Sequence, residues 1–333
     1  MSKTEKYVLD VCMLGPRGAG KTSLLASMYA QYTRIIGDTD LDLTPVGDTA
    51  VKLSDAVAVL ESLSRSVQVR DGVAGTERID LHRYDIGVGR KNKNPRFTLR
   101  FTDYAGELLR DLSGEAVGQK VRQTLQDSQV IVLAVDAPAL VARDGLYHNR
   151  INQPLLMFER IKEILREDQR PRLLVVTPLK GEKYLAGPHG AKELAEQVRA
   201  GYQPLFAHLA HPEIRPRVGC VLVPVQTTGS IVFSSTTESE DGTVQFHYRS
   251  RSPGAPYRPV DTDQPLRYAL RFVINVYRRE RRGAWREMME QTFRTDRALE
   301  AAIAQFTEGT RTGAGIQVIQ DHPYLHPADQ GRG

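Results

Sequence analysis

Residues 15–22 carry glycines, a lysine and a threonine at a spacing that suits phosphate binding. The segment reads Gly-Pro-Arg-Gly-Ala-Gly-Lys-Thr, a complete G-x-x-x-x-G-K-T pattern. Its glycines allow the backbone to turn sharply, so that successive N–H groups can point toward a polyphosphate. Lys21 would reach the β- and γ-phosphates, and the Thr22 hydroxyl would ligate Mg²⁺. The pattern therefore predicts a site for a nucleoside polyphosphate.

The segments on either side of this loop support the prediction. A mostly apolar run at residues 7–14 reads as a buried strand, and the residues from Ser23 onward begin a helix whose positive N-terminal end faces the loop. A glycine-rich turn that matches by chance is the alternative, and the strand–loop–helix context disfavours it. The predicted phosphate-binding residues are Gly15, Arg17, Gly18, Ala19, Gly20, Lys21, Thr22 and Ser23.

A second motif, Asp-Tyr-Ala-Gly-Glu at residues 103–107, follows an alternating apolar run. An Asp at the end of a strand can hold a Mg²⁺-bound water, and a Gly three residues later can offer its backbone N–H to the γ-phosphate. Such a pair senses the third phosphate, because the loop becomes ordered only when that phosphate is present. Asp-x-x-Gly alone is a weak signal, and a strand that ends in a tight turn is the alternative. Asp103 and Gly106 are the candidate residues.

Apolar patterning predicts the elements that must hold these motifs. Strands are expected at 7–14, 79–87, 96–103, 130–135, 173–176 and 218–225, of which the second and third form a hairpin and the last three suit a parallel sheet covered on both faces. Helices are expected at 21–35, 50–67, 118–126, 153–167, 191–208 and 265–277, with a continuation over 283–307 left open. This alternation predicts an α/β fold, a three-layer sandwich with a mostly parallel sheet.

Composition limits the class of protein. The chain has 333 residues, of which 41% are hydrophobic and 26% charged, and its net charge of +5 is mild. We expect one domain over residues 1–307 with insertions at about 38–75 and 234–263, and a poorly ordered tail over 308–333. We find no signal peptide or transmembrane run, and Cys12 and Cys220 lie in apolar runs, so that a cytoplasmic location with core thiols is expected.

Together, the two motifs and the order of the elements resemble the Ras-like and translation-factor-related GTPases, over residues 7 to about 280. The resemblance implies a P-loop NTPase fold in which a six-stranded, mostly parallel sheet has one antiparallel strand. It also implies a switch-loop threonine that completes the Mg²⁺ shell with Thr22 and Asp103. Thr76 is the best match, although an ordinary loop residue is an equal alternative, and Thr44 and Thr49 fit less well because an insertion separates them from the hairpin.

The resemblance assigns catalytic roles to Lys21, Gly106 and the residue that follows Gly106. That position is often a Gln that orients the attacking water, and in this chain it is Glu107. A carboxylate can accept a hydrogen bond from water but cannot donate one, and its charge opposes the γ-phosphate. We therefore expect slow GTP hydrolysis. A nucleotide-binding scaffold without meaningful turnover stays open.

Base recognition is the least regular part of the pattern. Guanine is usually selected by Asn-Lys-x-Asp, and residues 179–182 read Leu-Lys-Gly-Glu, so that Lys180 and Glu182 keep only the Lys-x-acid spacing. Thr227 lies in the loop that lays a backbone N–H against the base in this family. Guanine is favoured, while an ATPase of the same fold and a charged surface loop remain alternatives. Irregular loops of this kind resemble those of divergent bacterial GTPases from multigene signalling or phage-defence systems.

Partners follow from the same resemblance. It implies Mg²⁺, a guanine nucleotide (GTP or GDP) and a protein effector or activator. The densest basic patch, Arg278–Arg286, could bind nucleic acid or an anionic membrane surface. A solvated helix face, with arginine stems covering apolar surface, is the favoured interpretation of that patch.

Overall fold

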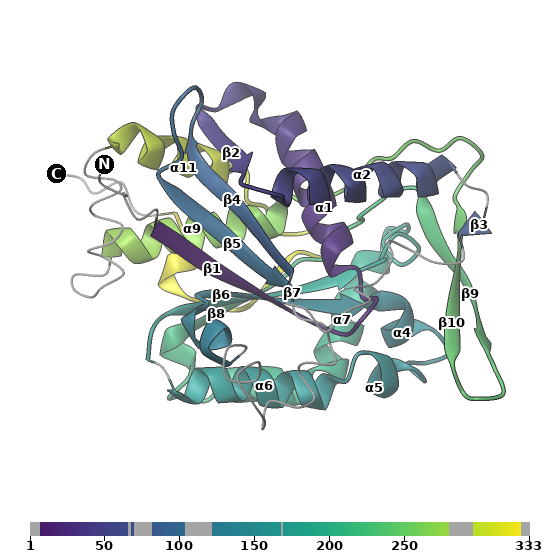
Figure 1. The fold of residues 1–333 in the computed structure, drawn as a ribbon. Coiled ribbons are helices and arrows are strands. Elements are labelled where there is room, and N and C mark those ends of the chain that lie inside the picture. The colour runs from purple at the N-terminus through teal and green to yellow at the C-terminus, as the bar shows by residue number, and fades with distance from the viewer. Residues whose placement is uncertain are drawn as a thin grey trace.

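A mixed sheet forms the centre of the protein. The structure, a computed structural model, describes residues 7–65, 68–69, 82–103, 122–167, 169–279 and 296–327. Within them the main sheet has eight strands in the order β11-β8-β7-β6-β1-β5-β4-β2 (Figure 1). These strands are β1 (Tyr7–Leu14), β2 (Leu41–Pro45), β4 (His82–Arg90), β5 (Phe97–Asp103), β6 (Val130–Asp136), β7 (Arg172–Leu179), β8 (Val218–Leu222) and β11 (Gln317–Gln320).

Strand directions confirm the predicted fold class. β5, β1, β6, β7 and β8 are parallel, whereas β4 runs antiparallel to both β5 and β2, and β11 runs antiparallel to β8. The sheet is therefore α/β and mostly parallel, but it is larger than the expected six strands. β2 and β11 add one strand at each edge, and both are short, which leaves little periodicity in the sequence to detect.

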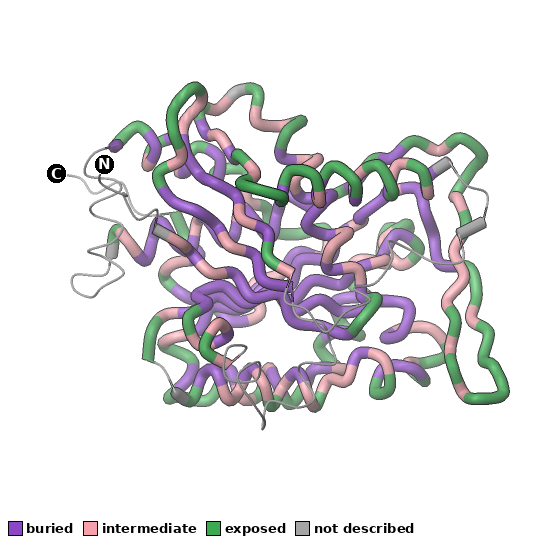
Figure 2. The backbone as a smooth tube through the Cα atoms, viewed as in Figure 1, coloured by how far each residue is buried: buried purple, intermediate pink, exposed green. Residues whose placement is uncertain are grey.

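Helices cover both faces of this sheet. One face packs against α1 (Lys21–Ile35), α9 (Gln264–Arg279) and α11 (Arg297–Glu308), and the other against α6 (Pro154–Glu167), α7 (Gly190–Gly201) and α8 (Gln203–Leu209). β1 shows why: Leu9, Val11 and Met13 enter the first core, and Cys12 and Leu14 enter the second. The central strands are accordingly buried (Figure 2). Three layers result, as predicted.

The two predicted insertions are structured. The first contains β2, the helix α2 (Thr49–Arg65), which packs on α1, and β3 (Gln68–Val69), so that its predicted helix is confirmed. The second contains a hairpin of β9 (Ile231–Glu238) and β10 (Val244–Ser250), which projects from the body (Figure 1). β3 pairs with β10 and completes a small three-stranded sheet. Exposed serines and threonines in β9 hide the apolar alternation that would have revealed this hairpin.

The expectation of a poorly ordered tail is wrong for most of residues 308–327. β11 pairs with β8, and η3, a 3₁₀ turn at Pro323–Leu325, follows it. Ile316 and Leu325 are buried in the core, and the Asn275 side-chain amide donates to the Tyr324 and His326 carbonyls at 3.0 and 2.7 Å. Tertiary packing thus orders a segment whose composition is rich in loop residues.

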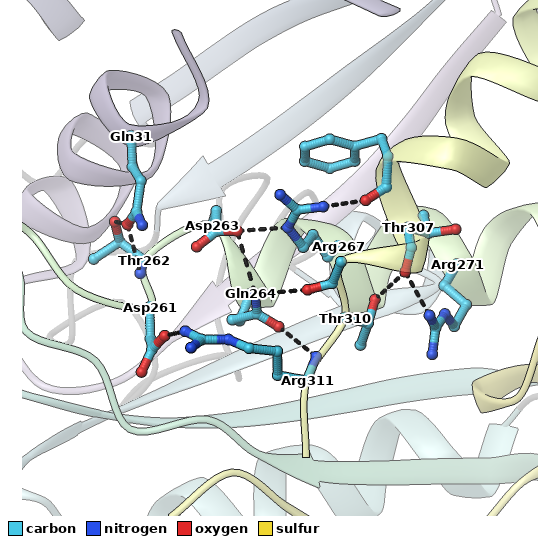
Figure 3. Close-up of polar contacts among 12 residues, drawn as sticks. Gln31, Asp261, Thr262, Asp263, Gln264, Arg267, Arg271, Thr307, Thr310 and Arg311 are labelled. Carbon is cyan, nitrogen blue, oxygen red and sulfur yellow. Dashed lines mark hydrogen bonds and ion pairs between the residues drawn. The ribbon is translucent and has the colours of Figure 1, made fainter. Parts of the chain in front are cut away.

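A polar network joins α1 to the start of α9 and the end of α11 (Figure 3). The Thr262 backbone N–H and hydroxyl both donate to the Gln31 side-chain oxygen on α1, at 3.0 and 2.5 Å. Arg267 and Arg271 on α9 donate to the last carbonyls of α11. Arginines suit this position, because the C-terminal carbonyls of a helix lack internal partners and carry partial negative charge. The network holds both C-terminal helices against the helix that follows the phosphate loop.

Arg172, which is only 1% exposed at the start of β7, gives a first prediction. Its guanidinium donates to the carbonyls of Leu125, Gln126 and Ser128, just before β6. Arg172→Leu should lower the free energy of unfolding by about 3 kcal/mol, because the buried Leu125 and Ser128 carbonyls lose a charged donor. Urea unfolding measures the change. Arg170→Leu is the matched control: Arg170 is exposed and also donates to the Gln126 carbonyl, and it should cost under about 1 kcal/mol. An unchanged urea midpoint for Arg172→Leu contradicts this account.

Candidate functional site

The predicted site residues converge on one edge of the sheet. β1 leads into the loop at 15–20 and β5 ends at Asp103, while β6 ends at Asp136. Lys180 directly follows β7, and Thr227 lies a few residues beyond β8. Because these five strands are parallel, their carboxyl ends share one edge, which is where open α/β sheets bind ligands.

Glycine is required at specific points of the loop. Gly15, Gly18 and Gly20 have φ angles of 143°, 74° and 103°. A Cβ on Gly15 would lie 2.6 Å from the carbonyl oxygen of Ala134, so that no side chain fits there. Gly20 stands just before α1 and has no side chain with which to cap it. The first N–H groups of α1 therefore face the loop, the arrangement that makes a helix N-terminus an anion site.

Lys21, Thr22 and Asp103 meet at the base of the loop. The Lys21 ammonium donates to the Gly15 and Pro16 carbonyls, both at 3.1 Å, and lies 3.4 Å from Asp103 Oδ1. The Thr22 hydroxyl donates to Asp103 Oδ2 at 3.3 Å. Burial raises the pKa of the Asp103 carboxyl, against the opposing effects of Lys21 and Thr22. Two motifs that are far apart in the chain thus form one cluster of a cation, a hydroxyl and a carboxylate.

The chemistry of this cluster fits a hard divalent cation. A hydroxyl and a carboxylate supply oxygen donors, which Mg²⁺ prefers. Asp103 Oδ1 is buried and faces the Lys21 ammonium at 3.4 Å as an ion pair, so that a cation could engage it if Lys21 turned to the phosphates. Thr22 and Asp103 are therefore compatible with the predicted metal role.

The outcome for the other residues predicted at the phosphate site differs from one residue to the next. Thr76, Gly106 and Glu107 lie outside the described residues. The two alternative threonines have partners of their own: the Thr44 hydroxyl donates to Asp42 at 2.7 Å, and Thr49 Oγ1 accepts from the Asp85 backbone N–H at 3.0 Å. Arg17 is exposed within the loop, and Ser23 lies in the first turn of α1.

Lys180 is held by a carboxylate and an aromatic ring. Its ammonium donates to Asp136 Oδ2 at 2.7 Å and lies 5.6 Å from the centroid of the Tyr248 ring, which comes from β10. Burial alone would lower the pKa of Lys180, but Asp136 outweighs that effect and holds the pKa above its usual range. Lys180 therefore stays charged. Its own φ of 56° is unusual for a residue with a side chain.

Glu182 is buried, at 2% exposure, against the loop that follows β8. Its Oε1 accepts from the Thr228 backbone N–H at 2.9 Å, the Thr228 hydroxyl at 3.0 Å and the Gly229 N–H at 3.4 Å. Burial nevertheless raises the pKa of the Glu182 carboxyl. The alternative of a solvated surface loop does not hold for this residue. Thr227, the predicted contact, is also buried, but its neighbours Thr228 and Gly229 make these bonds.

Sequence reasoning missed Asp136, Tyr248 and Arg251. Asp136 carried a detectable signal, since an Asp that ends an apolar strand and precedes Ala-Pro is typical of a helix N-cap. It does cap α4 (Ala137–Val141), accepting from the Ala139 N–H at 2.9 Å. Tyr248 and Arg251 belong to or adjoin the unpredicted hairpin, so that no motif pointed to them.

The basic patch is only partly within the described residues. Arg278, on α9, donates to Glu300 on α11 at 2.6 Å, so that this arginine joins two helices. Residues 280–286 lie outside the described part of the chain. None of the helices described is both long and apolar enough to cross a lipid bilayer.

The solved structures that resemble this one share little sequence identity with this chain. The GTPase-like domain of Saccharomyces cerevisiae Ski7 bound to GTP is 16% identical with a TM-score of 0.40, and the match covers 67% of this chain and 43% of that one. The Chaetomium thermophilum signal recognition particle receptor complex SRb-GTP/SRX is 14% identical, with a TM-score of 0.35 and coverage of 66% and 91%. Era in complex with MgGDPNP and a 16S ribosomal RNA segment is 10% identical, with a TM-score of 0.30 and coverage of 72% and 76%.

Family membership comes from the sequence. The comparison with curated proteins gave no match. A family model described as Double-GTPase 2 matches residues 11–216, which is more than half of the chain and includes the phosphate loop, Asp103, Lys180 and Glu182. The chain therefore belongs to the Double-GTPase 2 family and is a nucleotide-binding protein of the GTPase class.

Proposed function

We propose that this protein is a Mg²⁺-dependent guanine-nucleotide switch of the cytoplasm that hydrolyses GTP slowly and acts on a protein effector. The observation that carries the proposal is the convergence of Lys21, Thr22 and Asp103 beneath the glycine loop. The loop amides and Lys21 would bind the phosphates. Thr22 would ligate Mg²⁺ directly and Asp103 through water, and the metal would neutralise phosphate charge. Thr76 is the proposed switch-loop ligand.

The contacts of Lys21 suggest what nucleotide binding must change. Lys21 is engaged by two loop carbonyls and by Asp103. A triphosphate offers the ammonium stronger, charge-assisted acceptors than backbone carbonyls. Lys21 would therefore exchange its carbonyl partners for phosphate oxygens. The Gly106 N–H would then sense the γ-phosphate.

Turnover is proposed to be slow because of Glu107. Water would attack the γ-phosphate in line, and a carboxylate at this position cannot donate a hydrogen bond to orient that water. Its negative charge also opposes the phosphate. If no other group orients the water, the protein is a nucleotide-binding scaffold, and phosphate release measured under single-turnover conditions separates the two cases.

Guanine is the proposed base because of Glu182. A buried carboxylate beside the loop at 226–230 can accept from the N1–H and 2-amino groups of guanine, which adenine lacks. One of its oxygens already accepts from Thr228 and Gly229, so that the other must receive the base. Leu179 stands where the guanine-selecting motif usually has an Asn. The motif is therefore incomplete, and ATP is the alternative ligand.

Thermal unfolding in the presence of GDP, GTP, ADP or ATP, each with and without Mg²⁺, tests this proposal. A ligand at 100 times its Kd stabilises by about 2.7 kcal/mol, which raises Tm by a few degrees. GTP and GDP should do so, and Mg²⁺ should enlarge the GTP shift. Stabilisation by ATP alone would overturn the guanine assignment.

A further inference from the structure

The β9–β10 hairpin lies outside the residues that match the family model. It contacts the loop that carries Lys180, Glu182 and Tyr184, which we call the base loop. The match ends at residue 216, whereas the hairpin starts at Ile231. Tyr248 on β10 and Arg251, which directly follows β10, both reach the loop. Lys180 and Glu182, the two residues proposed to contact the base, are the ones they touch.

The first contact sets the direction of the Lys180 side chain. Its ammonium is fixed between the Asp136 carboxylate, at 2.7 Å, and the face of the Tyr248 ring, at 5.6 Å from the centroid. A cation over a tyrosine face is attracted by the negative face of the ring. With its head held at two points, the alkyl stem has few rotamers left. That stem is the part that would lie along a purine plane.

An aromatic cluster makes this position rigid. Tyr248 contacts Phe233 on β9 edge-to-face at 6.1 Å, and Phe233 stacks on Tyr184 of the base loop at 6.4 Å. Phe246 joins Phe233 at 6.0 Å and reaches Tyr147 on the body of the protein, also at 6.0 Å. Such pairs stabilise beyond their buried area. The hairpin is therefore packed against both the base loop and the body.

The second contact acts on Glu182. The Arg251 guanidinium donates to the Glu182 backbone carbonyl at 2.9 Å, and the Arg251 backbone N–H donates to the Ser230 carbonyl at 2.8 Å. Arg251 thereby ties the Glu182 backbone to the loop whose N–H groups bind the Glu182 carboxylate. Backbone and side chain of Glu182 are both held from the hairpin side.

We propose that the β9–β10 hairpin forms the outer wall of the base subsite, with Tyr248 positioning Lys180 and Arg251 positioning Glu182. The inference rests on the proposed function for the location of the base. The two residues have separable effects. Stacking on the Lys180 stem tolerates any purine, so that Tyr248 governs affinity, whereas the Glu182 carboxylate reads guanine, so that Arg251 governs the preference for GTP over ATP.

Tyr248→Ala tests the wall with two probes, GTP and inorganic tripolyphosphate, both titrated with Mg²⁺ by calorimetry. Tripolyphosphate has no base, so only the phosphate end binds it. The variant should raise the Kd for GTP about tenfold and speed GTP dissociation by a similar factor. Its Kd for tripolyphosphate should stay within about twofold of the wild-type value. Tyr248→Phe keeps the ring and should restore most of the GTP affinity, the remainder depending on the hydroxyl, which also interacts with Lys180. His247→Ala, the neighbouring β10 residue that contacts Thr237, is the matched control and should change neither probe.

Arg251→Ala should lower the ratio of GTP to ATP affinity about fivefold, because Glu182 loses one of its anchors. If Tyr248→Ala weakens the binding of GTP and of tripolyphosphate equally, the hairpin has only a structural role. If the GTP affinity is unchanged, the proposal that the hairpin forms a wall of the base subsite is wrong. If the wild type prefers ATP, the guanine assignment fails, but Tyr248→Ala still decides this inference with ATP as the probe. If the wild type binds neither nucleotide, both proposals fall.

Discussion

Lys21→Ala is expected to weaken Mg²⁺–GTP binding by a factor of about 100 to 1,000 and to remove phosphate release. The side chain is buried beneath the loop, donates to two carbonyls and lies 3.4 Å from a carboxylate, so that a full positive charge stands beside the proposed phosphate site. In such a low-dielectric site the loss of one charge is felt far more strongly than at the surface. Calorimetry and single-turnover phosphate release measure the two effects.

Lys52→Ala is the matched control for this variant. Lys52, on α2, forms a surface pair with Asp48, which directly precedes that helix, so that its removal should change neither binding nor turnover. Thermal unfolding of the ligand-free chain separates loss of binding from loss of fold. Identical phosphate release from wild type and Lys21→Ala would show that hydrolysis is not a function of this site.

Asp103→Asn is expected to abolish the Mg²⁺-dependent part of GTP affinity, by about 100-fold, while leaving the ligand-free protein at least as stable as wild type. Burial raises the pKa of this carboxyl, which means that the fold disfavours its charged form. A neutral isostere relieves that cost but cannot support the metal. Function and stability should therefore move in opposite directions. GTP titrations with Mg²⁺ and with EDTA measure the first, and urea unfolding the second.

The sign of the pH dependence follows from the same pKa. A carboxyl whose pKa is higher in the folded than in the unfolded chain binds a proton more readily when folded, so that this group adds stability as pH falls from neutral through its folded pKa. Asp103→Asn should lack that component, and the stability difference between variant and wild type should shrink toward acid pH. Asp48→Asn gives the opposite case: Lys52 lowers the pKa of this exposed carboxyl, so that the variant should be slightly less stable than wild type at neutral pH and approach it as the pH falls. A difference that grows toward acid pH would contradict the assignment.

The loop, strand and helix of the candidate phosphate site were predictable because their determinants are local. Glycine spacing dictates the loop, and the alternation of Phe97, Leu99 and Phe101 on β5 ends at Asp103. Lys21 and Thr22 sit at the first positions of a helix whose predicted bounds, residues 21–35, match α1. In each case the backbone conformation is set by residues within a few positions of the functional group.

The base end depends on tertiary contacts that leave no pattern in the sequence. The spacing of Lys180 and Glu182 was visible, but their partners Asp136, Thr228 and Tyr248 come from three other segments. β9 and β10 are held by backbone pairing and by aromatic contacts, with polar side chains along β9, so that periodicity could not reveal them. The edge strands β2 and β11 escaped detection for a similar reason.

The boundary of the family match has a practical meaning for the smallest piece of this chain that can fold. Residue 216 precedes β8 and β11, the last two strands on one side of the sheet. It also precedes α9 and α11, which supply much of the core on one face. A fragment ending there would expose that apolar face to water, and Glu182 would lose the Thr228 and Gly229 donors that bind its carboxylate. We therefore expect the smallest fragment that folds stably to extend past residue 216 to the η3 turn.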